Sequence, residues 1–245
     1  MPDVLATKAA SEPRTRSEPS EPIAPWPHTV LLVCVLALWA VYGMLHSRLL
    51  AGVMPRGMTY ISHIIIEFLL VGSTIAGLYH RRRFVREVFG SMSLRVAAFD
   101  IGEGCLVYVA GVIVMVVIGA IIRPLHPSFQ KDAVLAMAPH TAVELVLWMM
   151  LSFAAGSCEE FLFRGYLLRQ FECWWGGVPV AIVVSSVLFG CLHLYEGWGA
   201  VVGLCWLGAV YAIVAVRLGN LRSVIVGHFL QDAITGLVLY LRHGA

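Results

Sequence analysis

The segment that decides the fold reads AVELVLWMMLSFAAGSCEEFLFR, residues 142–164, a long and mostly apolar run that ends in three charged side chains. An ionised group is costly in hydrocarbon, so charges in such a run are usually functional or paired. If the run is helical, Glu160 and Arg164 are four residues apart and meet on one face. Glu159 then points about 100° away from Glu160. We therefore predict that Arg164 neutralises Glu160 and leaves Glu159 free for chemistry.

The composition indicates an integral membrane protein. Of the 245 residues, 59% are hydrophobic and 13% are charged, and the mean hydropathy is +0.82. Soluble domains average about 25% charged residues. The net charge of +2 is too small to suggest a nucleic-acid partner. The six cysteines contain no CxxC pair, which predicts neither a disulfide framework nor a zinc knuckle.

Hydrophobic runs predict an all-α, polytopic membrane bundle of about seven transmembrane helices. Each run has about the ~20 residues needed to cross a bilayer. The runs are apolar on all sides and lack the period-2 alternation of strands. The fourth is the longest and carries the glutamates. The predicted spans are 29–47, 59–80, 101–122, 140–170, 177–195, 198–217 and 222–241.

The regions between and before the spans complete the predicted organisation. Residues 1–27 are rich in Pro, Ser, Glu and Arg, which predicts a disordered tail before a transmembrane domain at 28–245. No signal-peptide pattern is present, so we expect the chain to begin at its native start. The arginines at 81–83 put more positive charge on the side of the N-terminus, which predicts that this end is cytoplasmic. Residues 81–100 suggest a helix on the cytoplasmic surface, and the proline-containing residues 123–139 an external loop.

Three pairs of residues with i,i+4 spacing lie on the fourth, fifth and seventh spans. Such spacing puts both members on one helix face, so three helices could direct polar groups into one cavity. The pairs are Glu160 with Arg164, Phe189 with His193, and His228 with Asp232.

Each of the last two pairs has a chemical and a structural interpretation. His193 could share a water with a carboxylate and help to deprotonate it, with Phe189 as a wall of the substrate cavity. Alternatively, His193 is an interfacial histidine at a helix end. His228 and Asp232 could hold an oxyanion or fix each other's geometry, or form a helix–helix hydrogen bond without a chemical role.

Four further polar residues lie in or beside the spans. We assign them interfacial or structural roles. They are His63, Glu67, Glu103 and Glu144.

The motifs EExxxR at 159–164, FxxxH at 189–193 and HxxxD at 228–232, in this order on separate spans, resemble the CPBP family of intramembrane proteases. That family includes Rce1-type CAAX prenyl endopeptidases and Abi relatives linked to bacteriocin self-immunity. The resemblance covers about 142–241, which we take as the catalytic core. It implies a glutamate-dependent endopeptidase of the bacterial inner membrane that needs no cofactor.

The resemblance also implies the role of each residue. Glu159 would activate water with help from His193, His228 and Asp232 would form the oxyanion site, and Glu160 with Arg164 would support them. Rce1-type enzymes have Asn at the position of Asp232. Because an ionised Asp cannot donate a hydrogen bond, we expect Asp232 to orient His228, which is then the only donor.

The expected substrate is a membrane-associated protein or peptide cut near its C-terminus, with lipid as the surrounding partner. The sequence leaves open whether a prenyl group is recognised and what the oligomeric state is. Two alternatives remain at this stage. One is a zinc-dependent variant with Glu159, His193 and His228 as ligands. The other is a non-enzymatic immunity or scaffold protein.

Overall fold

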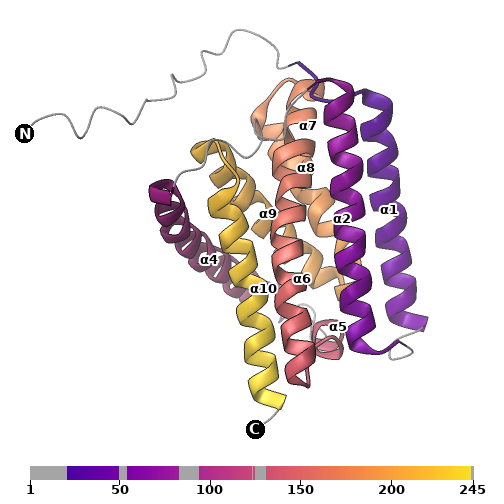
Figure 1. Cartoon of the computed structure of the whole chain (residues 1–245), viewed down its shortest axis with the longest axis vertical. Coiled ribbons are helices and arrows are strands. Elements are labelled where there is room, and N and C mark those ends of the chain that lie inside the picture. Colours follow the sequence, from indigo (N-terminus) through magenta and orange to yellow (C-terminus); the bar gives the residue numbers. More distant parts are fainter. Residues whose placement is uncertain (1–20, 50–53, 83–93, 123, 125–130, 244–245) are drawn as a thin grey trace, which may run out of the picture.

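The computed structural model describes residues 21–49, 54–82, 94–122, 124 and 131–243, and in these ranges the protein is a bundle of helices without strands (Figure 1). Six helical segments are long and apolar enough to cross a membrane. The helices are α1 Trp26–Leu49, α2 Arg56–His80, α4 Leu94–Ile122, α5 Lys131–Ala136, α6 Ala142–Glu160, α7 Leu168–Trp175, α8 Val178–Leu192, α9 Trp198–Leu218 and α10 Arg222–His243. A π-helix, η1 Phe161–Leu167, joins α6 to α7, and a 3₁₀ turn, η2 Leu194–Glu196, follows α8.

The predicted all-α membrane bundle is confirmed, but the fifth predicted span is shorter than expected. The expected fifth span, 177–195, forms only the 15-residue helix α8. At 1.5 Å per residue α8 is about 22 Å long, short of the ~30 Å hydrocarbon core. The fourth predicted segment is long, as expected, because α6, η1 and α7 form one continuous unit over Ala142–Trp175.

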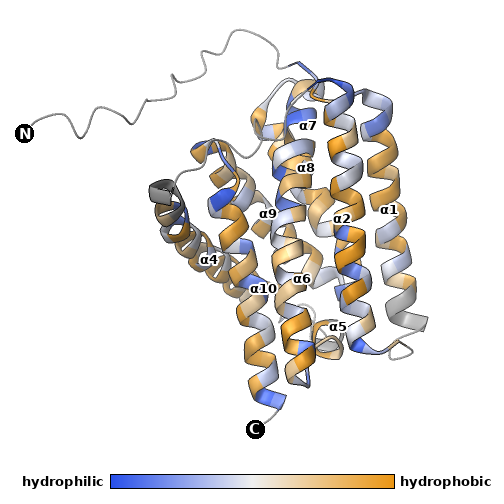
Figure 2. Cartoon of the chain, viewed as in Figure 1, coloured by the Kyte–Doolittle hydropathy of each residue, from blue (hydrophilic) through white to orange (hydrophobic). Residues whose placement is uncertain are grey.

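The surface of the bundle is apolar, as a lipid-facing surface requires. Figure 2 shows hydrophobic residues along the outer faces of the long helices. Large apolar side chains such as Leu31, Phe68 and Phe153 are exposed. These positions are covered by lipid when the protein is in a membrane.

Residues 1–20, 83–93, 123 and 125–130 lie outside the described residues. They include most of the predicted tail, most of the predicted surface helix and part of the predicted external loop. The described residues just before α1 are held against α7 by Gln170, whose side chain is fully buried. Its Oε1 accepts from the backbone N–H groups of Ile23 at 3.1 Å and Ala24 at 3.3 Å, and its Nε2 donates to the Ala24 carbonyl at 2.9 Å.

The unit of α6 and η1 lies between other helices in the bundle. α2 packs along one side of α6 and α10 along another, while α10 also packs against α4, and α8 against α9. Figure 1 shows α6 between α2 and α10. This arrangement places the glutamate motif inside the protein, away from lipid.

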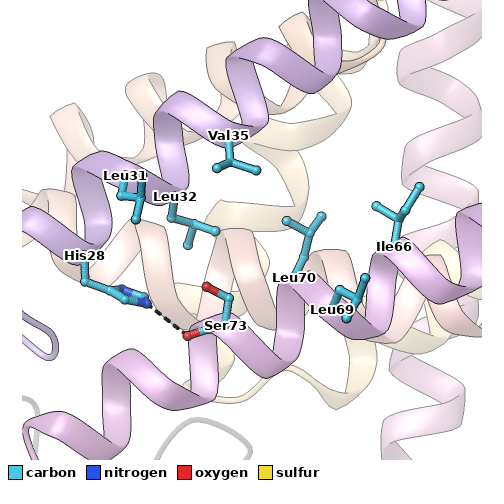
Figure 3. Close-up of a pocket in the computed structure, with 8 residues that line it drawn as sticks. All are labelled: His28, Leu31, Leu32, Val35, Ile66, Leu69, Leu70 and Ser73. Atoms are coloured by element: carbon cyan, nitrogen blue, oxygen red, sulfur yellow. Dashed lines mark hydrogen bonds between the residues drawn. The ribbon is translucent and has the colours of Figure 1, made fainter.

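An apolar cavity of about 280 Å³ lies between α1 and α2 (Figure 3). At one end the ring of His28 bonds through Nε2 to the Ser73 carbonyl at 3.0 Å. None of the predicted catalytic residues lines this cavity. Its lining consists of His28, Leu31, Leu32, Val35, Ile66, Leu69, Leu70 and Ser73.

Candidate active site

The two glutamates of the motif occupy the last turn of α6, where α10 comes close. Gly156 allows this approach, since a Cβ there would lie 2.9 Å from the backbone nitrogen of Phe229. Small residues let membrane helices pack backbone to backbone in this way. The contact brings His228, the neighbour of Phe229, next to Glu159 and Glu160.

Glu160 and Arg164 form a buried ion pair, with side-chain exposures of 0% and 1%. Arg164 Nη1 donates to Glu160 Oε1 at 2.8 Å, and Nη2 donates to the carbonyl of Gly208 on α9 at 3.0 Å. The guanidinium also lies 4.5 Å from the ring centroid of Phe189, within cation–π range. Gly208 leaves room for it, because a Cβ there would be 3.2 Å from Nη2.

Arg164 projects from η1, a π-helix whose seven residues are all buried. π-Helical turns are rare and often occur at functional sites. Sequence reasoning treated this region as a regular α-helix, and no motif in the sequence signals the wider turn. The i,i+4 contact between Glu160 and Arg164 nevertheless forms across the junction of α6 and η1.

The imidazole of His228 bridges the two glutamates. Its Nδ1 lies 2.8 Å from Glu160 Oε1, so Nδ1 carries the proton and donates it to the carboxylate. Its Nε2 faces Asp232 Oδ2 at 3.5 Å and Glu159 Oε2 at 3.9 Å, distances of charge contact and too long for hydrogen bonds. Glu160, held in turn by Arg164, therefore orients His228. The sequence had led us to expect this orientation from Asp232.

His193 caps the C-terminal end of α8. Its Nδ1 lies 3.0 Å from the carbonyl oxygen of Phe189. Because a carbonyl only accepts, Nδ1 carries the hydrogen and Nε2 of the neutral ring keeps a lone pair. No hydrogen bond or ion pair joins His193 directly to Glu159 in the described part of the chain.

Phe189 lies behind the two histidines. It is 1% exposed, and its ring centroid is 5.0 Å from that of His193 and 6.1 Å from that of His228. It therefore packs as a support between Arg164 and the imidazoles. Its predicted role as a wall of the substrate cavity stays a prediction.

Glu67 lies on α2, which packs against α6. Its Oε2 is buried and has no hydrogen-bond partner among the described residues, and its expected interfacial or structural role stays a prediction. The packing of α2 against α6 was not predictable, because the sequence does not show which spans are neighbours.

The other three polar residues have structural contacts. Glu144 forms a capping box with Thr141 at the start of α6. Glu103 accepts from Ser223 Oγ at 2.9 Å, and His63 Nδ1 contacts the Thr59 carbonyl at 2.8 Å.

A further acid, Glu196, lies in η2, outside the six spanning segments, and sequence reasoning did not single it out. Burial raises the pKa of Glu196 above its ordinary value of 4.5, and the negative charge of Glu159 raises it further. His193 and the hydrogen bond to the Tyr195 hydroxyl both lower this pKa, by less than burial raises it. Glu196 therefore belongs to the electrostatic surroundings of the site.

Within the described ranges no group of three His, Cys, Asp or Glu side chains is arranged to hold a metal ion. The three ligands that the zinc alternative requires, Glu159, His193 and His228, are therefore not gathered around one metal position, and these residues do not fit a resident zinc ion.

Among the described residues, six apolar helices of spanning length surround a buried cluster of ionisable side chains, which defines an integral, multi-pass membrane protein. Residues 141–234 match the model of a family described as type II CAAX prenyl endopeptidase Rce1-like. This match covers less than half of the chain, and it supports a CPBP/Rce1-type family and, in general, a CAAX-type intramembrane protease. No curated protein and no solved structure matches the chain significantly. The matched segment contains all the predicted site residues, whereas Glu67 lies outside it.

Proposed function

We propose that the protein is a glutamate-dependent intramembrane endopeptidase. It hydrolyses a peptide bond near the C-terminus of a membrane-associated protein or peptide. We place it in a bacterial inner membrane with its N-terminus in the cytoplasm. The observation that carries the proposal is the contact of His228 with Glu160 on one side and with Glu159 and Asp232 on the other, inside a segment of Rce1-like type.

Glu159 is the base in this proposal. One of its oxygens, Oε2, is buried and has no hydrogen-bond partner among the described residues, so it can accept a proton from water. Arg164 is occupied by Glu160 and the Gly208 carbonyl and does not neutralise Glu159. The free Nε2 lone pair of His193 accepts a second hydrogen bond from the same water.

His228 stabilises the developing oxyanion. For this it must be doubly protonated, because Nδ1 already donates to Glu160 and only an imidazolium also donates through Nε2. Carboxyl groups lie near both ring nitrogens, Glu160 at Nδ1 and Glu159 with Asp232 at Nε2, and they balance the positive charge of the imidazolium. Preorganised donors of this kind are commonly worth about 10²–10³ in rate.

The steps conserve atoms and charge. The water oxygen bonds to the carbonyl carbon while its proton passes to Glu159, and the carbonyl oxygen becomes an alkoxide facing Nε2–H of His228. The C–N bond then breaks and the proton on Glu159 moves to the leaving nitrogen. The products are a carboxylic acid and an amine, and Glu159 returns to its carboxylate form.

The test uses the full chain reconstituted in liposomes. The probes are a farnesylated peptide ending in a CAAX sequence and the same peptide without the farnesyl group, with fragments identified by mass. Glu159→Gln is expected to lower kcat at least about 100-fold, and Glu103→Gln is the matched control on α4. If Glu159→Gln cleaves at the wild-type rate, the assignment of the base is wrong. Comparison of the two peptides shows whether a prenyl group is recognised.

The two alternatives give different results in the same assay. In a non-enzymatic immunity or scaffold protein, the wild type cleaves neither peptide, and partner binding persists in the Glu159→Gln and His193→Ala variants. In a zinc enzyme, chelation abolishes cleavage and added zinc restores it. Activity that survives exhaustive chelation eliminates the zinc variant.

A further inference from the structure

The π-helix η1 makes a second set of polar contacts, with α1, on a side away from Arg164. Tyr166 comes two residues after Arg164, and side chains two positions apart do not share a helix face. The Tyr166 side chain is fully buried. Its hydroxyl oxygen lies 2.9 Å from His28 Nδ1 and 2.9 Å from Thr29 Oγ1, both near the start of α1. These two α1 residues lie outside residues 141–234, so the family match does not cover them.

The hydrogen bonds form a chain from the backbone of α2 to η1. His28 Nε2 lies 3.0 Å from the Ser73 carbonyl oxygen (Figure 3). Because a carbonyl only accepts, Nε2 carries the hydrogen, and Nδ1 of the neutral ring accepts from the Tyr166 hydroxyl. The single proton of Tyr166 is then used, so the Thr29 hydroxyl donates to the Tyr166 oxygen. The chain requires a glycine at Gly77, because a Cβ there would lie 2.5 Å from Cε1 of His28.

Gln170 extends the contact with α1 by one turn. It follows Tyr166 by four residues, so the two side chains share a face of the unit of η1 and α7. Its side-chain amide holds the backbone just before α1. On another side of η1, Arg164 donates to α6 and α9. η1 is thus fixed between two sets of polar contacts, one to α1 and one to the candidate active site.

The winding of η1 makes these contacts important for Arg164. A π-helical turn is rare and short, and uncommon backbone conformations persist where the surrounding structure holds them. Successive residues of an α-helix are rotated by about 100°, so a change in the winding of η1 would rotate Arg164 relative to the Gly208 carbonyl on α9. Contacts that hold the winding of η1 therefore also hold the guanidinium.

We propose that Tyr166 and His28 are positioning residues, which hold η1 so that the Arg164 guanidinium keeps its place in the site. Arg164 donates to Glu160, and Glu160 in turn accepts from Nδ1 of His228. The contacts at α1 therefore act on the proposed oxyanion donor from a distance. This inference rests on the proposed function of that site. Neither positioning residue touches the substrate.

Two variants each remove one buried tyrosine hydroxyl and keep the ring. Tyr166→Phe removes the hydroxyl that meets α1. Tyr60→Phe is the matched control, since Tyr60 on α2 is also fully buried and donates to the Met137 carbonyl. In the peptide assay, below the unfolding temperature of both variants, Tyr166→Phe is expected to lower kcat about fivefold or more with little change in KM. Tyr60→Phe should keep the wild-type kcat.

Substitutions of His28 separate its hydrogen bond to Tyr166 from its packing. His28→Asn keeps an acceptor close to the position of Nδ1, whereas His28→Leu fills similar space without one. The kcat of His28→Asn is therefore expected to stay above that of His28→Leu, which should fall about as far as that of Tyr166→Phe. Equal kcat values in the two His28 variants would mean that only packing matters, and they would overturn the role of His28.

Nuclear magnetic resonance tests the position of Arg164 without any substrate. With isotopically labelled arginine in the reconstituted full chain, the Arg164 guanidinium signal is assigned by its loss in Arg164→Met. The signal is expected to shift in Tyr166→Phe and His28→Leu and to stay unchanged in Tyr60→Phe. An unshifted signal in Tyr166→Phe overturns the inference, as does a wild-type kcat in this variant or an equal fall of kcat in Tyr60→Phe. If the wild type cleaves neither peptide, the proposed function fails, and the Arg164 signal still decides whether η1 is positioned from α1.

Discussion

Replacement of Arg164 by methionine should be among the most damaging single changes in this protein. Methionine fills much of the space of the arginine stem but removes two charged hydrogen bonds, to Glu160 Oε1 at 2.8 Å and to the Gly208 carbonyl at 3.0 Å. Hydrogen bonds to charged groups contribute about 1.5–3 kcal/mol each. Both side chains of the ion pair are at most 1% exposed, so Glu160 would be left as a buried charge with only His228 as its partner. Breaking such a pair costs about 3–5 kcal/mol, and we expect a loss of that size.

The assay is the free energy of unfolding in mixed micelles, measured by titration with a denaturing detergent. Arg164→Lys should lose less than Arg164→Met but should not match the wild type, since an ammonium lacks the planar fork that reaches both acceptors. Adding Glu160→Gln to Arg164→Met should recover part of the loss, because the double variant no longer buries a carboxylate that has lost its arginine. Arg217→Met, at an exposed arginine of α9, should change the free energy by less than about 0.5 kcal/mol. A loss below about 1 kcal/mol for Arg164→Met, or no recovery in the double variant, would refute the reasoning.

Two further changes test the surroundings of the site. The raised pKa of Glu196 means that the stability it contributes is fully present below pH 4.5 and is lost as the pH rises through its folded-state pKa. Glu196→Gln should therefore raise the melting temperature relative to the wild type at neutral pH, and the difference should vanish near pH 4; an equal difference at both pH values would contradict this. Gly156→Ala would place a Cβ 2.9 Å from the backbone nitrogen of Phe229, and we expect a destabilisation of about 1–3 kcal/mol together with reduced cleavage. The matched control is Gly72→Ala on α2, where nothing lies within 4 Å of the added atom, and this variant should be neutral or slightly more stable.

Hydrophobicity and residue spacing were enough to predict the class of the protein and the local pairing in the site. Long apolar runs require membrane-spanning helices, because backbone polar groups must be satisfied within the segment. The spacing of Glu160 and Arg164 along one continuous helical segment fixed their contact, since residues four apart share a helix face whatever the rest of the chain does. The order of the three motifs further indicated the family.

Which groups from different helices meet could be learned only from the packing of the bundle. The bond from His228 to Glu160 joins residues 68 positions apart, and the bond from Arg164 to the Gly208 carbonyl joins η1 to α9. The early end of α8 and the π-helix η1 were likewise not encoded in a recognisable local pattern. The physical reason is that a membrane helix is apolar on nearly all sides. Its sequence has no amphipathic stripe to show which face turns inward. Which helices become neighbours, and how each is rotated about its axis, therefore depends on close packing at small residues such as Gly156 and Gly208.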